Sequence, residues 1–159
     1  MGRRGTKAVS SAGRRSRNHS KRCRSSLWSE LVEYRASERK LSLFCGDYFA
    51  FDAGPFDGHY DRGALIAMSP ELRPRYAEHT ASLLSNDATQ FVITVEYERE
   101  GCVGPPFSVP GHVLHELWPG LRERARVDDT ANAPPKFVDA GLDQLHEVVW
   151  MTGRDGNRA

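Results

Sequence analysis

The chain has 159 residues and a mass of 17.8 kDa; 39% of its residues are hydrophobic and 27% are charged, which suits one soluble domain with a core. No run is long and apolar enough to span a bilayer, and the N-terminus lacks the apolar segment of a signal peptide, so we expect a cytoplasmic protein with no membrane partner. The three cysteines are odd in number and widely spaced, which argues against a disulfide framework or a zinc ribbon, and we expect no metal site.

The formal net charge of +1 hides a strong asymmetry. Nine of the 22 basic residues lie in residues 1–24, which hold none of the 21 acidic residues, so the remainder carries a net charge of −8. Residues 1–26 have almost no large apolar side chains, and we expect a disordered basic tail ahead of a domain over residues 27–159. A nucleic-acid partner for this tail is disfavoured, because it has no aromatic side chains to stack on bases. A solvated tail without a role, or a stretch read out of frame from GC-rich DNA, explains it better.

The first predicted elements come before residue 69. Leu27, Trp28, Leu31 and Tyr34 have helical spacing and predict a short amphipathic helix within residues 27–40. Residues 41–45 predict a short strand that ends at a Gly-Asp pair. Residues 56–60 predict the next strand, which is followed by an Asp-Arg pair and a short apolar segment over residues 64–68.

A helix and the best strand of the chain come next. Ser69, a proline and a glutamate form a helix start, and the helix should run to about Ser85, where Asn86-Asp87 ends it. We expect its buried side to carry four apolar residues: Leu72, Tyr76, Leu83 and Leu84. The run QFVITVEY over residues 90–97 predicts a strand buried on both faces.

The last third of the chain alternates rigid, helical and extended segments. Three prolines stiffen the loop over residues 104–110. Residues 113–118 predict a short helix, and residues 122–127 and 145–152 predict two strands. This alternation predicts an open α/β sheet, in which a ligand lies beside the carboxyl ends of the strands, near Asp61 and Arg62.

Several blocks resemble the thiopurine S-methyltransferase family in order and spacing: CGDYF, YDRGALIAM, SPELRPRYAEHTASLL, ITVEY and GPPFSVP, with GLDQLHEVVWM resembling the last strands. The resemblance covers about residues 41–153. It implies a Rossmann-like class I methyltransferase sheet and S-adenosylmethionine as cofactor, and we expect the chain to be a monomer. The implied reaction is methyl transfer to the sulfur of an aromatic or heterocyclic thiol, or to a selenium or tellurium species. No catalytic residue is implied, because aryl thiols ionise readily.

The resemblance also implies residues on the cofactor side. Arg62 matches an arginine that contacts the cofactor, and the alternative is a structural ion pair with Asp61 or Asp47. Gly46 and Asp47 match the segment beside the adenine, although Asp47 equally suits a loop cap.

On the substrate side, Lys136 falls where the family has an arginine near the thiol, so it keeps the charge but lacks the planar fork. Pro106 and Phe107 match a wall of the substrate pocket, and a packed loop is the alternative.

The sequence departs from the family ahead of residue 41. It lacks the glycine-containing loop after a first strand and the acidic end of a second strand, which hold the methionine moiety and the ribose. We therefore expect the C-terminal part of the sheet only, and weak or no binding of S-adenosylmethionine by this chain. The alternative function is a non-catalytic remnant, or an interaction module with a nucleic-acid-binding arm.

Overall fold

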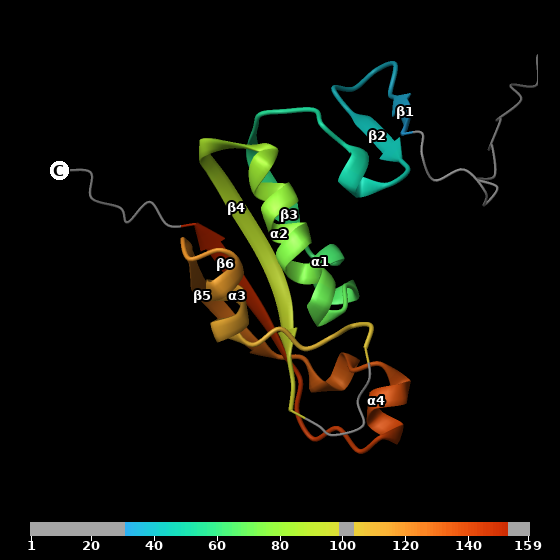
Figure 1. Cartoon of the computed structure of the whole chain (residues 1–159). Helices are drawn as coiled ribbons and strands as arrows, with labels where there is room; N and C mark the ends of the chain where they lie inside the picture. The colour runs from blue at the N-terminus through green and yellow to red at the C-terminus, as the bar shows by residue number, and fades with distance from the viewer. Residues whose placement is uncertain (1–30, 99–103, 153–159) are drawn as a thin grey trace, which may run out of the picture.

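A computed structural model describes residues 31–98 and 104–152, and a four-stranded mixed sheet is its centre. The strand order is β3 (Phe56–Asp61), β4 (Leu84–Glu96), β6 (His146–Thr152) and β5 (Leu121–Asp128) (Figure 1). β3 and β4 are parallel, whereas β6 is antiparallel to both of its neighbours. The predicted α/β class is confirmed, and each of these strands covers a segment that the sequence predicts as extended. Because β6 runs the opposite way, its first residues lie at the edge where β3 and β4 end.

Helices cover one face of this sheet (Figure 1). They are α1 (Ala64–Ala67), the short 3-10 turn η2 (Pro70–Leu72), α2 (Arg73–Ser82) and α3 (Gly111–Leu117). α3 confirms the short helix predicted over residues 113–118.

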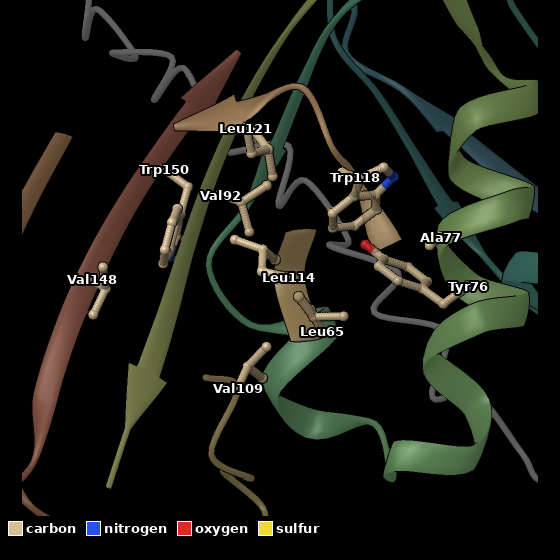
Figure 2. Packing of buried hydrophobic residues seen from close by; sticks show 10 residues of the cluster. All are labelled: Leu65, Tyr76, Ala77, Val92, Val109, Leu114, Trp118, Leu121, Val148 and Trp150. Atoms are coloured by element: carbon tan, nitrogen blue, oxygen red, sulfur yellow. The ribbon is translucent and has the colours of Figure 1, made fainter. Parts of the chain in front are cut away.

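The main core lies between these helices and the sheet. Figure 2 shows Tyr76 of α2 facing Trp118, whose ring centroid is 6.1 Å away, with Leu65 and Leu114 packed beneath them. The remaining members come from the strands and the loop before α3: Val92, Val109, Leu121, Val148 and Trp150, with Ala77 from α2. One continuous apolar core therefore holds the helices on the sheet.

The two faces of β4 are buried unequally. Gln90, Val92 and Thr94 are buried on the helical side, whereas Phe91 and Ile93 on the opposite side are half-buried. The prediction of a strand buried on both faces is therefore correct for one face only. In the part of the chain that the structure describes, α4 (Pro135–Asp139) and its flanking loop reach the second face only near the end of β4.

The helix predicted to reach Ser85 ends earlier, at Ser82, and Asn86-Asp87 lie inside β4 rather than at a helix end. The reason is tertiary, because the carbonyl of Leu83 accepts a hydrogen bond of 2.8 Å from the first residue of β3. Leu84 then pairs with Phe56 of β3, and after an irregular stretch the parallel pairing continues from Thr89. Tyr76 and Leu83 are buried as predicted, whereas Leu72 is 45% exposed and Leu84 is half-buried.

The segment before β3 forms a separate two-stranded hairpin (Figure 1). β1 (Val32–Arg35) pairs antiparallel with β2 (Ser42–Cys45), and the short 3-10 turn η1 (Tyr48–Ala50) follows. The prediction of a strand over residues 41–45 is confirmed, but the helix predicted within residues 27–40 is wrong where it is described. Val32 and Tyr34 lie opposite Cys45 and Leu43, so cross-strand pairing overrides the helical spacing. Leu27, Trp28 and the basic tail lie outside the described residues.

The connection between β5 and β6 holds two elements that the sequence does not signal, the 3-10 turn η3 (Thr130–Asn132) and α4. Phe137 of α4 packs with Leu142 and Leu145 in a second, smaller core. No helix within residues 31–98 and 104–152 has the length and apolar character needed to cross a membrane.

Candidate functional site

Asp61 organises the turn at the end of β3. Its carboxylate is buried and accepts hydrogen bonds from the backbone N–H groups of Gly63, Ala64 and Leu65 at 2.9, 2.9 and 3.1 Å. The hydroxyl of Tyr76 donates a fourth hydrogen bond at 2.8 Å. Burial, reinforced by the negative charge of Asp61, raises the pKa of the Tyr76 hydroxyl, which therefore stays protonated. Asp61 thus caps α1 from outside the helix and fixes the backbone on either side of Arg62.

Arg62 points away from this buried cluster, and its side chain is 62% exposed. A guanidinium nitrogen lies 3.2 Å from Oε2 of Glu147, near the start of β6. This hydrogen bond raises the pKa of Arg62. The structural alternative of an ion pair is therefore correct in kind but wrong in partner, since the carboxylate belongs to Glu147 and not to Asp61 or Asp47. Contact of Arg62 with a cofactor stays a prediction.

Gly46 and Asp47 lie in the turn between β2 and η1. Asp47 caps η1 by accepting a hydrogen bond of 3.0 Å from the backbone N–H of Phe49, as its alternative role as a loop cap predicts. Gly46 has a φ of 155°, which favours glycine. An apolar cavity of about 230 Å³ lies beside it, lined by Leu31, Phe44, Gly46, Tyr48 and Phe51.

Tyr48 connects this turn to α2, the helix whose Tyr76 donates a hydrogen bond to Asp61. The Tyr48 hydroxyl lies 2.9 Å from Oγ1 of Thr80 on α2, and its ring centroid is 5.3 Å from that of Tyr76. The two sequence-predicted parts of a cofactor site, around Gly46 and around Arg62, therefore share α2 as a common support.

The rigid loop over residues 104–110 is attached to several elements. The N–H of Phe107 donates to the carbonyl of Ile66 at 2.6 Å, which ties the loop to α1. The hydroxyl of Tyr97 donates to the carbonyl of Pro106 at 2.8 Å, and the N–H of Tyr97 donates to Oγ of Ser108 at 3.1 Å. These contacts hold the loop against the end of β4.

Lys136 of α4 joins the same loop. Its Nζ donates to the carbonyl of Pro105 at 2.7 Å and lies 5.1 Å from the ring centroid of Phe137. A Cβ at position 104 would overlap the ring of Phe107, so glycine is required there for the ring to pack over the loop. The three residues predicted on the substrate side, Lys136, Pro106 and Phe107, thus belong to one hydrogen-bonded unit.

The sequence did not predict a second cavity, which lies where β4 ends and β6 begins. Its volume is about 420 Å³, larger than that of the cavity beside Gly46. Its lining residues are Glu96, Tyr97, Glu98, Ser108, Pro110, Arg126, Asp143, Gln144 and His146. Glu96 pairs with Arg126 at 2.8 Å, and hydrogen bonds to Glu123 and Glu96 raise the pKa of Arg126. The position of Glu96 at the carboxyl end of the strongest predicted strand is a signal in the sequence, whereas nothing in the sequence brings Arg126 and His146 to the same place.

The comparisons with known proteins agree with the blocks quoted above. The family model described as thiopurine S-methyltransferase matches residues 6–155, starting ahead of residue 41, where the quoted blocks begin. A thiopurine S-methyltransferase of Bordetella petrii is 36% identical over 121 residues, 73% of this chain and 55% of that protein. One from Pseudomonas syringae pv. pisi is 35% identical over 119 residues, 72% of this chain and 55% of that protein.

A crystal structure of the 1,6-didemethyltoxoflavin-N1-methyltransferase of Burkholderia thailandensis, with 1,6-didemethyltoxoflavin and S-adenosylhomocysteine bound, is also similar. The TM-score is 0.38 and the identity 21%, over 69% of this chain and 49% of that one. The chain spans about half the length of the curated relatives that it matches. The match of the family model to residues 6–155, nearly the whole chain, shows that the protein belongs to the thiopurine S-methyltransferase family.

Proposed function

We propose that this chain is an S-adenosylmethionine-dependent methyltransferase that acts on the sulfur of an aromatic or heterocyclic thiol, or on a small selenium or tellurium species. One observation carries the proposal. The end of β4, the loop over residues 104–110, α1 and α4 are joined by hydrogen bonds beside a cavity of about 420 Å³. The named activity of the relatives supports the same reaction. A monomeric state and a cytoplasmic location are part of this proposal.

The residues present fit two parts of the cofactor. S-adenosylmethionine carries a carboxylate, and the exposed guanidinium of Arg62, with one carboxylate partner in the structure, has further N–H groups to donate. It also carries an adenine ring, and the aromatic lining of the cavity beside Gly46 suits a planar base. When bound, the cofactor supplies the electrophilic methyl group of a sulfonium.

The chain's own residues then bind and orient the acceptor. Pro106 and Phe107 supply a wall held by Tyr97 and by the backbone of Ile66, so the acceptor meets a surface of fixed shape. The ammonium of Lys136, beside Pro105, favours an acceptor in the thiolate form. No general base is required, and alignment of two reacting groups contributes roughly 7–11 kcal/mol in favourable cases.

A methyl-transfer assay tests the proposal. The chain is incubated with millimolar S-adenosylmethionine and thiophenol or 6-mercaptopurine, and the S-methyl product is measured by mass spectrometry. We expect slow product formation that rises with cofactor concentration without saturating, in keeping with the weak binding predicted from the sequence. The Lys136→Gln variant should need more acceptor for the same rate.

Absence of product above a heat-denatured control, with a thiol and with selenide, would contradict the proposal. Salt-dependent binding of DNA that is lost when residues 1–26 are deleted would favour the interaction module instead.

A further inference from the structure

Arg73, the first residue of α2, is a buried cation. It is 3% exposed, and none of the ion pairs among the described residues joins it to a carboxylate. One guanidinium nitrogen donates to the carbonyl of Ser108 at 3.1 Å. The buried Nε has no hydrogen-bond partner among the described residues. Burial lowers the pKa of Arg73, against the opposing influence of Tyr97 and Glu71. Burying a charge without a carboxylate partner costs free energy of folding. If this side chain served packing alone, an apolar side chain of similar length would fill the space more favourably.

The carbonyl that Arg73 holds belongs to Ser108, a residue that lines the larger cavity. Ser108 lines that cavity, and its Oγ accepts the N–H of Tyr97, which lines it too. Tyr97 in turn donates its hydroxyl to Pro106. A short chain of contacts therefore runs from the guanidinium through Ser108 and Tyr97 to the predicted substrate wall.

We propose that Arg73 is a positioning residue for the acceptor, which fixes the loop over residues 104–110 by holding the carbonyl of Ser108. This inference rests on the proposed function of the adjoining cavity as the acceptor site. A hydrogen bond from a charged donor is stronger and more directional than packing, so the loop keeps one conformation when the acceptor enters. Arg73 itself lies behind the wall and is not proposed to touch the acceptor.

Arg75, two residues further along α2, provides the matched control. It is exposed, and its guanidinium carbon lies 3.9 Å from the ring centroid of Phe49. Arg73→Met and Arg75→Met therefore remove the same charge and a similar volume from one helix, but only the first change breaks the contact with Ser108.

The test compares hydrogen exchange at the backbone amides of Tyr97, Phe107 and Val109, each of which bonds to or from the loop. We expect about tenfold faster exchange at these amides in Arg73→Met and no change in Arg75→Met. In the methyl-transfer assay, Arg73→Met should raise the KM for the acceptor about tenfold with little change in kcat. Arg73→Lys, which keeps the charge without the planar fork, should lie between the wild type and Arg73→Met in both measurements.

Wild-type exchange at the three amides in folded Arg73→Met would overturn the proposal, as would an unchanged KM for the acceptor. Failure of both Arg73 variants to fold would also overturn it, because Arg73 would then serve the core rather than the loop. If the wild-type chain transfers no methyl group, the proposed function fails, while the exchange measurement still decides whether Arg73 holds the loop.

Discussion

The hydroxyl of Tyr76 donates a hydrogen bond to Oδ2 of Asp61 at 2.8 Å, and this contact ties the middle of α2 to the end of β3. Asp61 is 4% exposed and Tyr76 is also 4% exposed, so neither group has water as an alternative partner. The pair therefore supports the turn that directs Arg62 outward.

Tyr76→Phe should destabilise the fold by about 1.5–3 kcal/mol, because it removes a hydrogen bond to a charged group while keeping the ring. Urea unfolding monitored by circular dichroism measures the change. The control is Tyr48→Phe, which removes a contact between two neutral hydroxyls at 2.9 Å and should cost about 0.5–1.5 kcal/mol. Equal costs for the two variants would show that the charge of Asp61 contributes nothing through Tyr76.

Arg62→Ala should leave the melting temperature unchanged, because the ion pair with Glu147 is exposed and screened by solvent. The same change should weaken S-adenosylmethionine binding roughly tenfold, by equilibrium dialysis, if Arg62 donates to the cofactor carboxylate. Glu147→Gln removes the same ion pair but keeps the guanidinium, so it should leave cofactor binding at least as strong as in the wild type. A lower melting temperature with unchanged binding in Arg62→Ala would assign Arg62 a purely structural role.

Gly111→Ala should destabilise the fold by about 1–3 kcal/mol through overpacking. A Cβ at position 111 would lie 2.9 Å from Cη2 of Trp150. That indole cannot move aside easily, since it is 2% exposed and its Nε1 donates to Oγ1 of Thr94 at 2.9 Å. Gly63→Ala, with no atom within 4 Å of its added Cβ, should change stability by less than about 0.5 kcal/mol. Thermal unfolding of both variants checks this, and a stable Gly111→Ala protein would show that the ring can shift.

His59 should make stability depend on pH. Burial lowers its pKa from the ordinary value of 6.5, with Asp61 opposing, so the folded protein holds His59 neutral where the unfolded chain binds a proton. The stability contributed by the neutral form is therefore fully present above pH 6.5 and falls as the pH drops towards the folded-state pKa.

Urea unfolding at several pH values, in wild type and His59→Gln, measures this dependence. The variant should lose less stability on acidification than the wild type does, whereas His112→Gln, at an exposed position of α3, should behave as the wild type. An identical loss in the wild type and His59→Gln would rule out His59 as the source.

Much of the sheet could be predicted from local patterns. The β-branched run around Val92 and Ile93 and the apolar run around Val148 and Trp150 each prefer extended structure, so both strands appear where they are expected. The resemblance likewise pointed to Pro106, Phe107 and Lys136, which lie in one hydrogen-bonded unit, although their role towards an acceptor stays a prediction.

Other features depended on partners that no local pattern specifies. Asn86 and Asp87 are typical of a helix end, yet they lie inside β4, in the irregular stretch between the residues that pair with Phe56 and Gly58 of β3. Tyr34 has helical spacing with its neighbours, yet antiparallel pairing with Leu43 makes its segment extended. In both cases the pairing of the strand with a partner strand outweighs weak local preferences.

The amino-acid sequence by itself determined the family, the four extended segments of the main sheet and the acidic-basic pair at the end of β3. Each of these depends on residue types that lie close together in the chain. Only the tertiary structure decided what that pair does. The carboxylate of Asp61 accepts its hydrogen bonds from the turn and from Tyr76. Arg62 therefore pairs with Glu147 instead, a residue 85 positions away in the chain. That contact exists because antiparallel β6 starts at the edge where β3 and β4 end, and this register follows from packing across the whole sheet.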